Sequence, residues 1–375
     1  MLNVNRIVVK LGTSTLTGGA KKLSAPRMVD LARQVNGLQA QGHQVILVSS
    51  GAIAAGREAL GYPALPKYLP SKQMLAAVGQ PHLMALYERM FAIYGERTAQ
   101  VLITRSDLTD RRRFLNARNT LEALLHQHVI PIINENDTVA TEEIRFGDND
   151  NLSAQVANLV EADLLVLLTD QEGLYTADPR QDPQARLIPE VGPEPFAAGL
   201  WQSAGGSNSG LGTGGMTTKL QAADLARHGG TTVIIAQGAE PDVLLRLARG
   251  EALGTRLLPA VNKLEGRKRY ILSGSHPGNG ENTNGQLDVD AGAQRALARG
   301  GSLLPAGVTQ VRGEFERGDT VRVVGPDGRH LAVGLSNYAA SDVLQLCGKH
   351  SADIEAVLGY TLGDEVIHRN NMILL

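Results

Sequence analysis

Two lysines lie where the sequence predicts a site for an anion. Lys10 is near the end of a short apolar segment, residues 6–12, whose pattern indicates a β-strand. A lysine near the end of a buried strand is costly unless it has an anionic partner, although an edge lysine can instead extend its ammonium group to water. Gly12, Thr13 and Ser14 follow at once, and a turn of this composition favours an anion.

The second lysine, Lys219, follows a glycine-rich segment, residues 203–215. A helical pattern begins at Met216, so this lysine falls in the first turn of the expected helix. A glycine-rich loop that leads into a helix is typical of a phosphate-binding cradle, whereas a flexible linker is the alternative interpretation. The P-loop pattern Gly-x-x-x-x-Gly-Lys-Ser/Thr does not occur in the chain, so any such cradle is of another kind.

A third cluster lies in residues 133–151, between an apolar run and a helical pattern. Its members are Asn134, Asp137, Asp148, Asn149 and Asp150. Asparagine supplies hydrogen-bond donors and acceptors, and carboxylates supply acceptors only. The set therefore suits an α-amino acid, whose ammonium group needs acceptors and whose carboxylate needs donors. The alternative is a turn in which the Asn and Asp side chains bond to the local backbone.

The elements that must position these residues alternate between strand and helix. Apolar runs predict strands at residues 6–12, 44–48, 99–103, 129–133, 163–168 and 231–236. Helical spacing predicts helices at residues 24–42, 71–91, 111–128, 152–160 and 216–228. Continuous apolar strands imply a parallel sheet that helices cover on both faces, and hence the α/β class. In such sheets ligands bind outside the carboxyl ends of the strands, where the polar clusters fall.

The composition narrows the class of protein. The chain has 375 residues, of which 43% are hydrophobic and 20% charged, which is typical of a protein with a sizeable core and two or three domains. Its net charge of −2 gives no general attraction to nucleic acid or to an anionic membrane. The single cysteine, Cys347, excludes an intrachain disulfide. Since we also find no leader and no apolar run of membrane-spanning length, we expect a cytoplasmic protein.

The character of the chain changes near Val261. Residues 263–269 hold four Lys/Arg, and residues 275–285 are rich in Gly, Asn and Pro. The turn Pro326-Asp327-Gly328 between two apolar runs indicates that the C-terminal part is small and β-rich. We therefore predict a first domain, a linker and a second domain at residues 1–262, 263–283 and 284–375.

Six short motifs, in this order, resemble the amino-acid kinase superfamily and, within it, the glutamate 5-kinase family. They are VVKLGTS (8–14), SSGAIAAG (49–56), INEND (133–137), GDNDNLSA (147–154), LLTD (167–170) and GTGGMTTK (212–219). The C-terminal portion resembles a PUA domain, a fold often found in RNA-modifying proteins. The resemblance implies a three-layer αβα sandwich with a mostly parallel central sheet, followed by a small β-rich PUA-like domain.

The same resemblance implies ATP-dependent phosphorylation of the γ-carboxylate of L-glutamate to L-glutamyl 5-phosphate for proline synthesis, with feedback inhibition by proline. It implies a homo-oligomer, and Mg²⁺ held mainly by ATP phosphates and water, without a protein ligand. Lys10, Lys219 and Asp150 are then catalytic, with Asp150 holding the lysines in place. Substrate binding falls to Ser50, Asn134, Asp137, Asp148 and Asn149, and regulation to Glu143. The nucleotide side comprises Lys10, Gly12, Thr169, Asp170, Thr213, Gly214, Gly215, Met216, Thr217, Thr218 and Lys219.

Other functions remain open at this point. Acetylglutamate kinase, aspartokinase and uridylate kinase share the lysine arrangement, but the Asn-Glu-Asn-Asp motif at 134–137 and the PUA-like tail favour a glutamate 5-kinase. An RNA-binding protein is disfavoured, because residues 284–375 hold 8 Lys/Arg against 11 Asp/Glu, and so a net charge of −3, where a nucleic-acid site is basic. The intact Lys10, Asp150 and Lys219 argue against a catalytically inactive amino-acid sensor.

Overall fold

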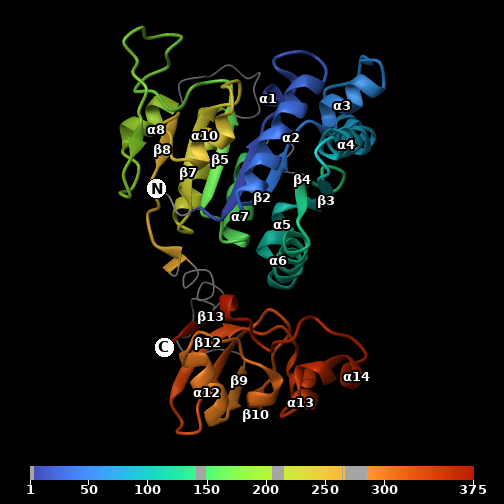
Figure 1. The fold of residues 1–375 in the computed structure, drawn as a ribbon, viewed down its shortest axis with the longest axis vertical. Coiled ribbons are helices and arrows are strands. Elements are labelled where there is room, and N and C mark those ends of the chain that lie inside the picture. The colour runs from blue at the N-terminus through green and yellow to red at the C-terminus, as the bar shows by residue number, and fades with distance from the viewer. Residues whose placement is uncertain (1–3, 141–148, 205–214, 264, 267–284) are drawn as a thin grey trace. The chain divides into compact units, whose positions relative to one another are not determined.

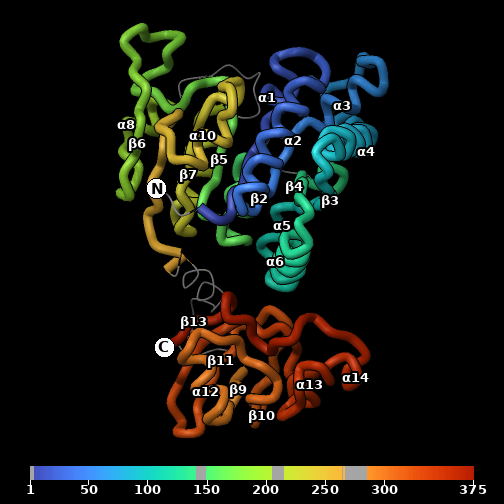
Figure 2. The backbone as a smooth tube through the Cα atoms, viewed as in Figure 1, coloured from blue at the N-terminus to red at the C-terminus, as the bar shows by residue number. Residues whose placement is uncertain are grey.

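The structure, a computed structural model, describes residues 4–140, 149–204, 215–263, 265–266 and 285–375. Figures 1 and 2 show the path of the chain. It divides into two compact units, of which the first comprises Met1–Thr109 and Asn116–Lys263 and the second Asp110–Leu115 and Leu264–Leu375. Because most of the predicted linker, residues 263–283, lies outside the described residues, the domain boundaries stay a prediction.

Strands and helices alternate in the chain up to residue 263. In order they are β1 (Arg6–Leu11), α1 (Thr13–Thr17), α2 (Ala25–Ala40), β2 (Gln44–Ser49), α3 (Ala52–Ala59), α4 (Leu69–Ala92), β3 (Arg97–Ile103), α5 (Arg105–Thr109), α6 (Arg111–His126), β4 (Val129–Glu135), α7 (Asn149–Leu159), β5 (Leu164–Thr169), β6 (Glu190–Val191), α8 (Ala198–Ala204), α9 (Met216–Arg227), β7 (Thr232–Gln237), α10 (Val243–Ala248) and β8 (Thr255–Leu257).

The strands of the first unit form one eight-stranded sheet with the order β3-β4-β2-β1-β5-β7-β8-β6. Neighbouring strands are parallel, except that β7 and β8 are antiparallel. The direction of strand addition reverses at β1, because the chain continues to β2 on one side and later to β5 on the other. Lys10 on β1 pairs in register with Val48 on β2 and Leu167 on β5. The carboxyl ends of these strands therefore meet at a topological switch point, where α/β sheets bind their ligands.

Side-chain alternation along β1 decides which helices its residues meet. Ile7, Val9 and Leu11 join one buried core with residues of α2, α4 and α10. Val8 and Lys10 must face the opposite side of the sheet, where α7 packs against β1 and β5, and α9 packs against β7 and α7. The predicted α/β class, with a mostly parallel sheet between two helix layers, is confirmed (Figure 1).

Helices α3 and α4 pack closely beside the end of β2. Gly51, the N-cap of α3, has φ 111°, a conformation that favours glycine. A Cβ atom on Gly79 of α4 would lie 1.8 Å from the carbonyl oxygen of Ala52, so only glycine allows this approach. Pro81 lies inside α4, and the helix continues through it. The buried face of α4, including Leu83, Tyr87 and Phe91, packs in the core, and this burial outweighs the hydrogen bond that proline removes.

The second unit has its own small sheet and core. Its elements are β9 (Gly285–Val289), α12 (Ala291–Ala298), η2 (Pro305–Gly307), β10 (Val308–Gly313), β11 (Thr320–Val324), β12 (His330–Leu335), α13 (Ala340–Leu346), η3 (Ser351–Asp353), α14 (Ile354–Leu358), η4 (Arg369–Asn371) and β13 (Met372–Leu374). The strand order is β10-β9-β11-β12-β13, and only the β9/β11 pair is parallel. The predicted small β-rich module is confirmed. In neither unit does a described helix combine the length and the apolar character needed to span a membrane.

Candidate active site

Lys10, Asp150 and Lys219 converge into one buried cluster at the carboxyl end of β1. Lys10 Nζ lies 2.6 Å from Asp150 Oδ1, and Lys219 Nζ lies 3.3 Å from Oδ2 of the same carboxylate. Asp150 is fully buried, and each lysine is only 5% exposed. Thr218 Oγ1 donates a hydrogen bond of 2.8 Å to Asp150 Oδ2. The carboxylate therefore links strand β1 to helix α9 and fixes both ammonium groups.

Burial and charge act in opposite directions on these groups. Burial alone would raise the pKa of Asp150, but Lys10, Lys219 and the Thr218 hydroxyl together hold that pKa below its ordinary value. Burial lowers the pKa of Lys219, and this effect exceeds the opposing attraction of Asp150. With both lysines protonated, two ammonium groups share one carboxylate in a nearly dry site. The cluster then keeps an excess positive charge, which low dielectric makes strongly attractive to an anion.

Two helices begin at this cluster. The first turn of α7 carries Asp150, and the first turn of α9 carries Lys219. Gly215, the N-cap of α9, has no side chain with which to cap the helix. Helix N-termini present N–H groups and partial positive charge, so they add to the field of the lysines. Of the predicted phosphate cradle, the structure describes Gly215 and the first turn of α9, whereas residues 205–214 lie outside the described residues.

Gly12 leaves open space beside the Lys10 ammonium group. A Cβ atom on Gly12 would lie 3.5 Å from Lys10 Nζ, so a larger side chain would occupy the volume in front of the lysine. Thr169 ends the neighbouring strand β5, and its hydroxyl donates a hydrogen bond of 3.1 Å to Asp170 Oδ1. Because β1 and β5 are adjacent, these residues of the predicted nucleotide side share one edge of the sheet with Lys10.

A cluster of amides lies on the other side of β1, at the ends of β2 and β4. Asn149 Nδ2 donates to Ser50 Oγ at 2.9 Å, to Asn134 Oδ1 at 3.0 Å and to the carbonyl of Ser49 at 3.2 Å. Both hydrogens of Asn149 Nδ2 are thus used in hydrogen bonds within the protein. Asn149 Oδ1 is buried and, within the described part of the chain, has no hydrogen-bond partner. A buried acceptor without a donor is costly, so this atom is suited to a donor from a ligand.

Asp137 is a second group that lacks a partner, because no described basic side chain pairs with its carboxylate. It is partly buried, and burial raises its pKa to about 6, with no described basic side chain opposing that rise. Asp137 lines a cavity of about 250 Å³ together with Gln80, Gln100 and Glu135. A ligand ammonium group would supply the missing positive charge and restore the ordinary acidity of this carboxyl group.

Two hydroxyls of the predicted nucleotide segment contact the protein itself. The hydroxyl of Thr218 donates to Asp150, as described above, and Thr217 Oγ1 donates to the carbonyl of Ala204 at 3.0 Å. Sequence reasoning also missed Gln80 on α4, whose Oε1 accepts from Asn134 Nδ2 at 2.8 Å. Nothing in the sequence around Gln80 signals this contact, because it depends on how α4 packs.

The remaining predicted residues of the site fall into two groups. Gly215 and Met216 begin α9 beside the cluster. Four others lie outside the described residues, and they are Glu143, Asp148, Thr213 and Gly214.

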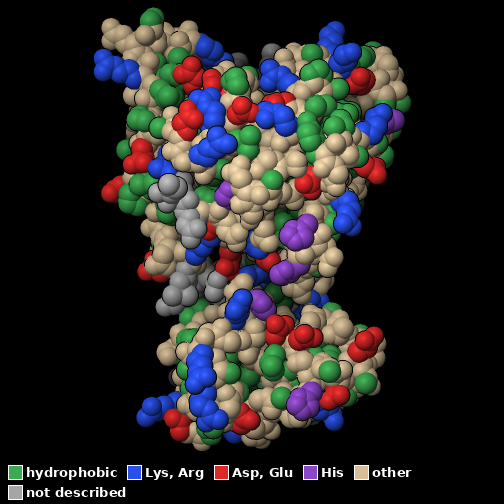
Figure 3. Space-filling view, in the orientation of Figure 1, with side chains coloured by type: hydrophobic (Ala, Val, Ile, Leu, Met, Phe, Trp, Pro, Cys, Tyr) green, Lys and Arg blue, Asp and Glu red, His purple; other side chains and the backbone are tan. Residues whose placement is uncertain are grey.

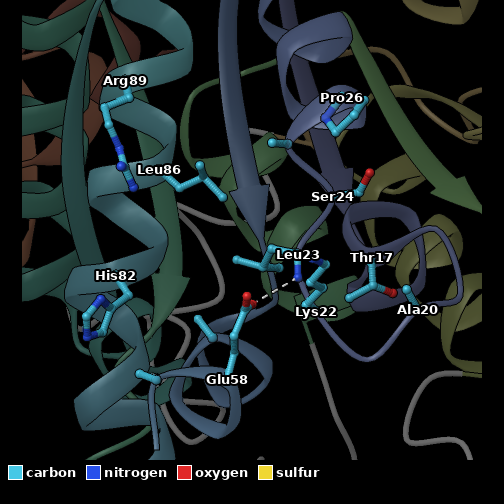
Figure 4. Close-up of a pocket in the computed structure, with 13 residues that line it drawn as sticks. Thr17, Ala20, Lys22, Leu23, Ser24, Pro26, Glu58, His82, Leu86 and Arg89 are labelled. Atoms are coloured by element: carbon cyan, nitrogen blue, oxygen red, sulfur yellow. Dashed lines mark hydrogen bonds between the residues drawn. The ribbon is translucent and has the colours of Figure 1, made fainter. Parts of the chain in front are cut away.

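A larger pocket, of about 590 Å³, lies elsewhere on the first unit and holds none of the predicted site residues. Figure 4 shows that its walls come from the end of α1, the segment that follows it, the start of α2, and helices α3 and α4. Lys22, His82, Arg89 and Glu58 are among its exposed lining residues. Glu58 Oε2 accepts a hydrogen bond of 3.4 Å from the Leu23 amide, drawn as the dashed line in the figure.

Comparisons with known proteins show the family to which the chain belongs. The amino acid kinase family model matches residues 5–237, and the PUA domain model matches residues 285–358. The chain is 55% identical over 371 residues to the glutamate 5-kinase of Deinococcus radiodurans, covering 99% of this chain and 100% of that protein. It is 56% identical over 371 residues to the glutamate 5-kinase of Shewanella amazonensis, covering 99% of this chain and 96% of that protein.

A third relative, the glutamate 5-kinase of Vibrio vulnificus, is 54% identical over 370 residues, covering 98% of this chain and 96% of that protein. These matches run through both units, and the family models place the kinase domain before the PUA domain, as the sequence predicts. The chain therefore belongs to the glutamate 5-kinase family within the amino acid kinases, and is a kinase with a C-terminal PUA domain.

Proposed function

We propose that this protein transfers the γ-phosphoryl group of ATP to the γ-carboxylate of L-glutamate, giving L-glutamyl 5-phosphate in the first step of proline biosynthesis. The observation that carries the proposal is the buried cluster in which the Lys10 and Lys219 ammonium groups share the Asp150 carboxylate. Asn149 Oδ1 and the Asp137 carboxyl group, which lack a described partner, match the needs of an amino acid's ammonium group. The names of the relatives support the same substrate.

The chemistry of this reaction needs charge neutralisation more than proton transfer. The carboxylate nucleophile is already ionised at neutral pH, so no general base is required. Its difficulty is repulsion by the polyanionic phosphate, and phosphoryl transfer is catalysed mainly by positioning and by electrostatic stabilisation. Lys10 and Lys219 project from β1 and α9, so they can contact the transferring group from two sides. Asp150 orients both lysines while leaving one positive charge uncompensated.

The amide cluster provides for the two α-groups of glutamate. Asn149 Oδ1 and the Asp137 carboxylate can accept hydrogen bonds from the α-ammonium group. Ser50 Oγ accepts from Asn149, so its own hydrogen remains to be donated to the α-carboxylate. Asn134 Nδ2 uses one hydrogen on Gln80 and keeps the other. We assign Asp148 to the same side of the site because it adjoins Asn149 in the sequence.

ATP is assigned to the carboxyl ends of β1 and β5, with Gly12, Thr169, Asp170 and residues 213–219 around it. No three His, Cys, Asp or Glu side chains converge in the described parts of the chain, and Asp150 is committed to two lysines. The residues present therefore fit a Mg²⁺ ion that arrives with ATP and is held by phosphate oxygens and water. When bound, that ion supplies further neutralisation of the phosphate charge.

We extend the proposal to feedback inhibition by proline, competitive with glutamate. Proline keeps the α-carboxylate and the α-nitrogen but lacks the γ-carboxylate, so Asn134, Asp137 and Asn149 can bind either molecule. Discrimination then falls to the segment near the γ-position, to which we assign Glu143. A ligand shifts a conformational equilibrium only through its different affinity for the two states, so this segment must contact the two ligands differently.

The direct test is ATP turnover with glutamate, aspartate, N-acetylglutamate and UMP, with any acyl phosphate trapped as its hydroxamate. We expect γ-glutamyl hydroxamate from glutamate and no comparable product from the others. Turnover of another substrate in place of glutamate would overturn the proposal. Glutamate binding without any turnover would instead indicate an amino-acid sensor.

An RNA-binding role for the second unit has less support. Residues 284–375 carry a net charge of −3, and Figure 3 shows acidic as well as basic side chains on this unit. Sequence-independent affinity for nucleic acid comes mainly from Lys and Arg contacts with phosphates, and it falls steeply with salt. A PUA domain family match is the observation that keeps this alternative open.

A further inference from the structure

A chain of side-chain amides runs from an edge strand of the large sheet to the proposed substrate pocket. Gln100 Oε1 on β3 accepts from Gln80 Nε2 at 3.3 Å, and Gln80 Oε1 accepts from Asn134 Nδ2 at 2.8 Å. Asn134 Oδ1 in turn accepts from Asn149 Nδ2 at 3.0 Å. Gln80, Asn134 and Asn149 are all buried, with exposures of 8%, 3% and 8%. The described structure thus contains a built polar path, most of which is shielded from water.

Backbone groups fix the direction of this path. The Glu135 amide donates to Asn134 Oδ1 at 2.9 Å, and the Ser49 carbonyl accepts from Asn149 Nδ2 at 3.2 Å. A backbone N–H can only donate and a carbonyl can only accept, so neither Asn side chain can be turned over without an unfavourable contact. Asn134 must therefore present Nδ2 toward α4, where a buried donor needs an acceptor.

Gln80 supplies that acceptor because of where α4 lies. Gly79, its neighbour in the sequence, permits the close contact between α4 and the start of α3. Gln80 then reaches Asn134 on β4 from a helix that contributes none of the predicted site residues. Without Gln80 Oε1, the Asn134 amide would keep its Oδ1 contacts but lose the acceptor for its Nδ2, so that a buried donor would be left without a partner.

We propose that Gln80 is a positioning residue for substrate binding. Gln80 holds the Asn134 amide so that one Nδ2 hydrogen of Asn134 remains for the α-carboxylate of glutamate. Asn134 Oδ1 in turn holds the Asn149 amide, so that Asn149 Oδ1 can accept from the α-ammonium group. This inference rests on the proposed function, and it adds a residue that contacts Asn134 rather than the reacting atoms. It predicts an effect on glutamate affinity and not on the chemical step.

The test is steady-state kinetics of the full chain with Gln80→Met, which keeps the length of the side chain and removes the acceptor. We expect the KM for glutamate to rise about tenfold, the effect of losing one buried hydrogen bond, with kcat and the KM for ATP within about twofold. Gln127→Met is the matched control, because Gln127 is exposed, follows α6 and lines neither this path nor the cavity beside Asp137. It should leave both KM values within about twofold of wild type.

A double-mutant cycle shows whether Gln80 acts through Asn134. In an Asn134→Ala background, Gln80→Met should change the KM for glutamate by less than about twofold, because the shared contact is already lost. Effects that multiply would overturn the proposal, as would an unchanged glutamate KM in Gln80→Met or an equal rise in Gln127→Met. If Gln80→Met does not fold, Gln80→Ala and Gln80→Glu replace it. The Glu variant keeps an oxygen acceptor and should stay closer to the wild-type KM.

The outcomes for the two proposals can be told apart. A wild-type protein that phosphorylates no glutamate would remove the proposed function. A wild-type protein that phosphorylates glutamate, with a Gln80→Met variant of unchanged glutamate KM, would remove only the role of Gln80.

Discussion

The lysine–aspartate cluster lies at the end of β1, and the residues Ser50, Asn134, Asp137 and Asn149, which we call the amide pocket, lie at or near the ends of the neighbouring strands β2 and β4. The two regions differ in how complete they are. In the cluster, both oxygens of Asp150 lie close to ammonium groups, and all three charged groups are buried. In the amide pocket, Asn149 Oδ1 has no described partner, and Asp137 has no described positive charge beside it. The first region is preorganised by the protein, whereas the second leaves two groups without a described partner.

This difference separates two tasks of an enzyme. Groups that are fixed before the reaction can stabilise charge that develops in the transition state, and their loss appears mainly in kcat. Polar groups that have no partner in the free protein can bind the substrate, and their loss appears mainly in KM. The two regions should therefore respond differently to substitution.

The largest effect is expected from the lysines. Lys10→Ala and Lys219→Ala should each lower kcat by about a hundredfold or more, because each removes a charged donor from the transferring phosphoryl group. Initial rates of phosphoryl transfer at saturating substrates measure this effect. Lys22→Ala is the control, since Lys22 is exposed and lines the separate surface pocket. A kcat near the wild-type value in Lys10→Ala or Lys219→Ala would contradict the proposed role of the lysine–aspartate cluster in the transition state.

Substitutions in the amide pocket should act on glutamate alone. Asn149→Ala and Asp137→Ala are expected to raise the KM for glutamate by roughly 10- to 100-fold, because each removes a partner of the α-ammonium group. Titration calorimetry with a non-hydrolysable ATP analogue should show nearly unchanged nucleotide affinity. If nucleotide affinity fell as far as glutamate affinity, the two regions would not be separate.

The sequence predicts which residues share the site more readily than it predicts how they contact one another. The sequence motifs predict that Lys10 and Asp150 belong to the same site. The topology around β1 is what places the two side chains in contact. The contact of Gln80 with Asn134 joins residues 54 positions apart, and it depends on how closely α4 approaches α3. No local pattern carries such information, because it is a property of tertiary packing.

The same limit applies to the fold. Long apolar strands such as β5 are evident in the sequence, whereas β6 has two residues and β8 has three. Strands this short have no period to detect. Helix α4 passes through Pro81 because its apolar face is buried, so tertiary burial overrides a strong local signal.

The open state of the amide pocket should reduce the stability of the free protein. The pKa of Asp137 is raised from 3.8 to about 6, so the folded state binds this proton more tightly than the unfolded chain. The contribution of Asp137 to stability is therefore present at low pH and is lost as the pH rises through about 6. At pH 8, Asp137→Asn should raise the free energy of unfolding by roughly 1–3 kcal/mol.

Urea denaturation across the pH range checks this prediction. The gain from Asp137→Asn should shrink as the pH is lowered from about 8 to about 5, where the folded wild type regains the proton. Saturating glutamate should stabilise the wild type more than the variant. A gain that did not depend on pH would show that the effect is not due to the carboxyl group.

Proline inhibition tests how the amide pocket distinguishes glutamate from proline. Asp137→Ala should weaken both glutamate use and proline inhibition, whereas Glu143→Ala should raise the inhibition constant for proline on the order of fivefold more than the glutamate KM. Initial rates against glutamate at several proline concentrations measure both quantities. A lower maximal rate without a higher apparent KM would instead indicate a separate site for proline.

The smallest effect is expected from removing the second domain. The described residues of both regions precede Val261, and each domain has its own buried core. A domain with its own core can in principle fold alone. The cut does leave Asp110–Leu115, which belong to the second unit, without their partners in that unit. A chain that ends at Val261 should therefore fold and phosphorylate glutamate with kcat and KM within about threefold of the full chain. Circular dichroism and the hydroxamate assay check both points. A folded chain without activity would show that phosphoryl transfer depends on the PUA domain.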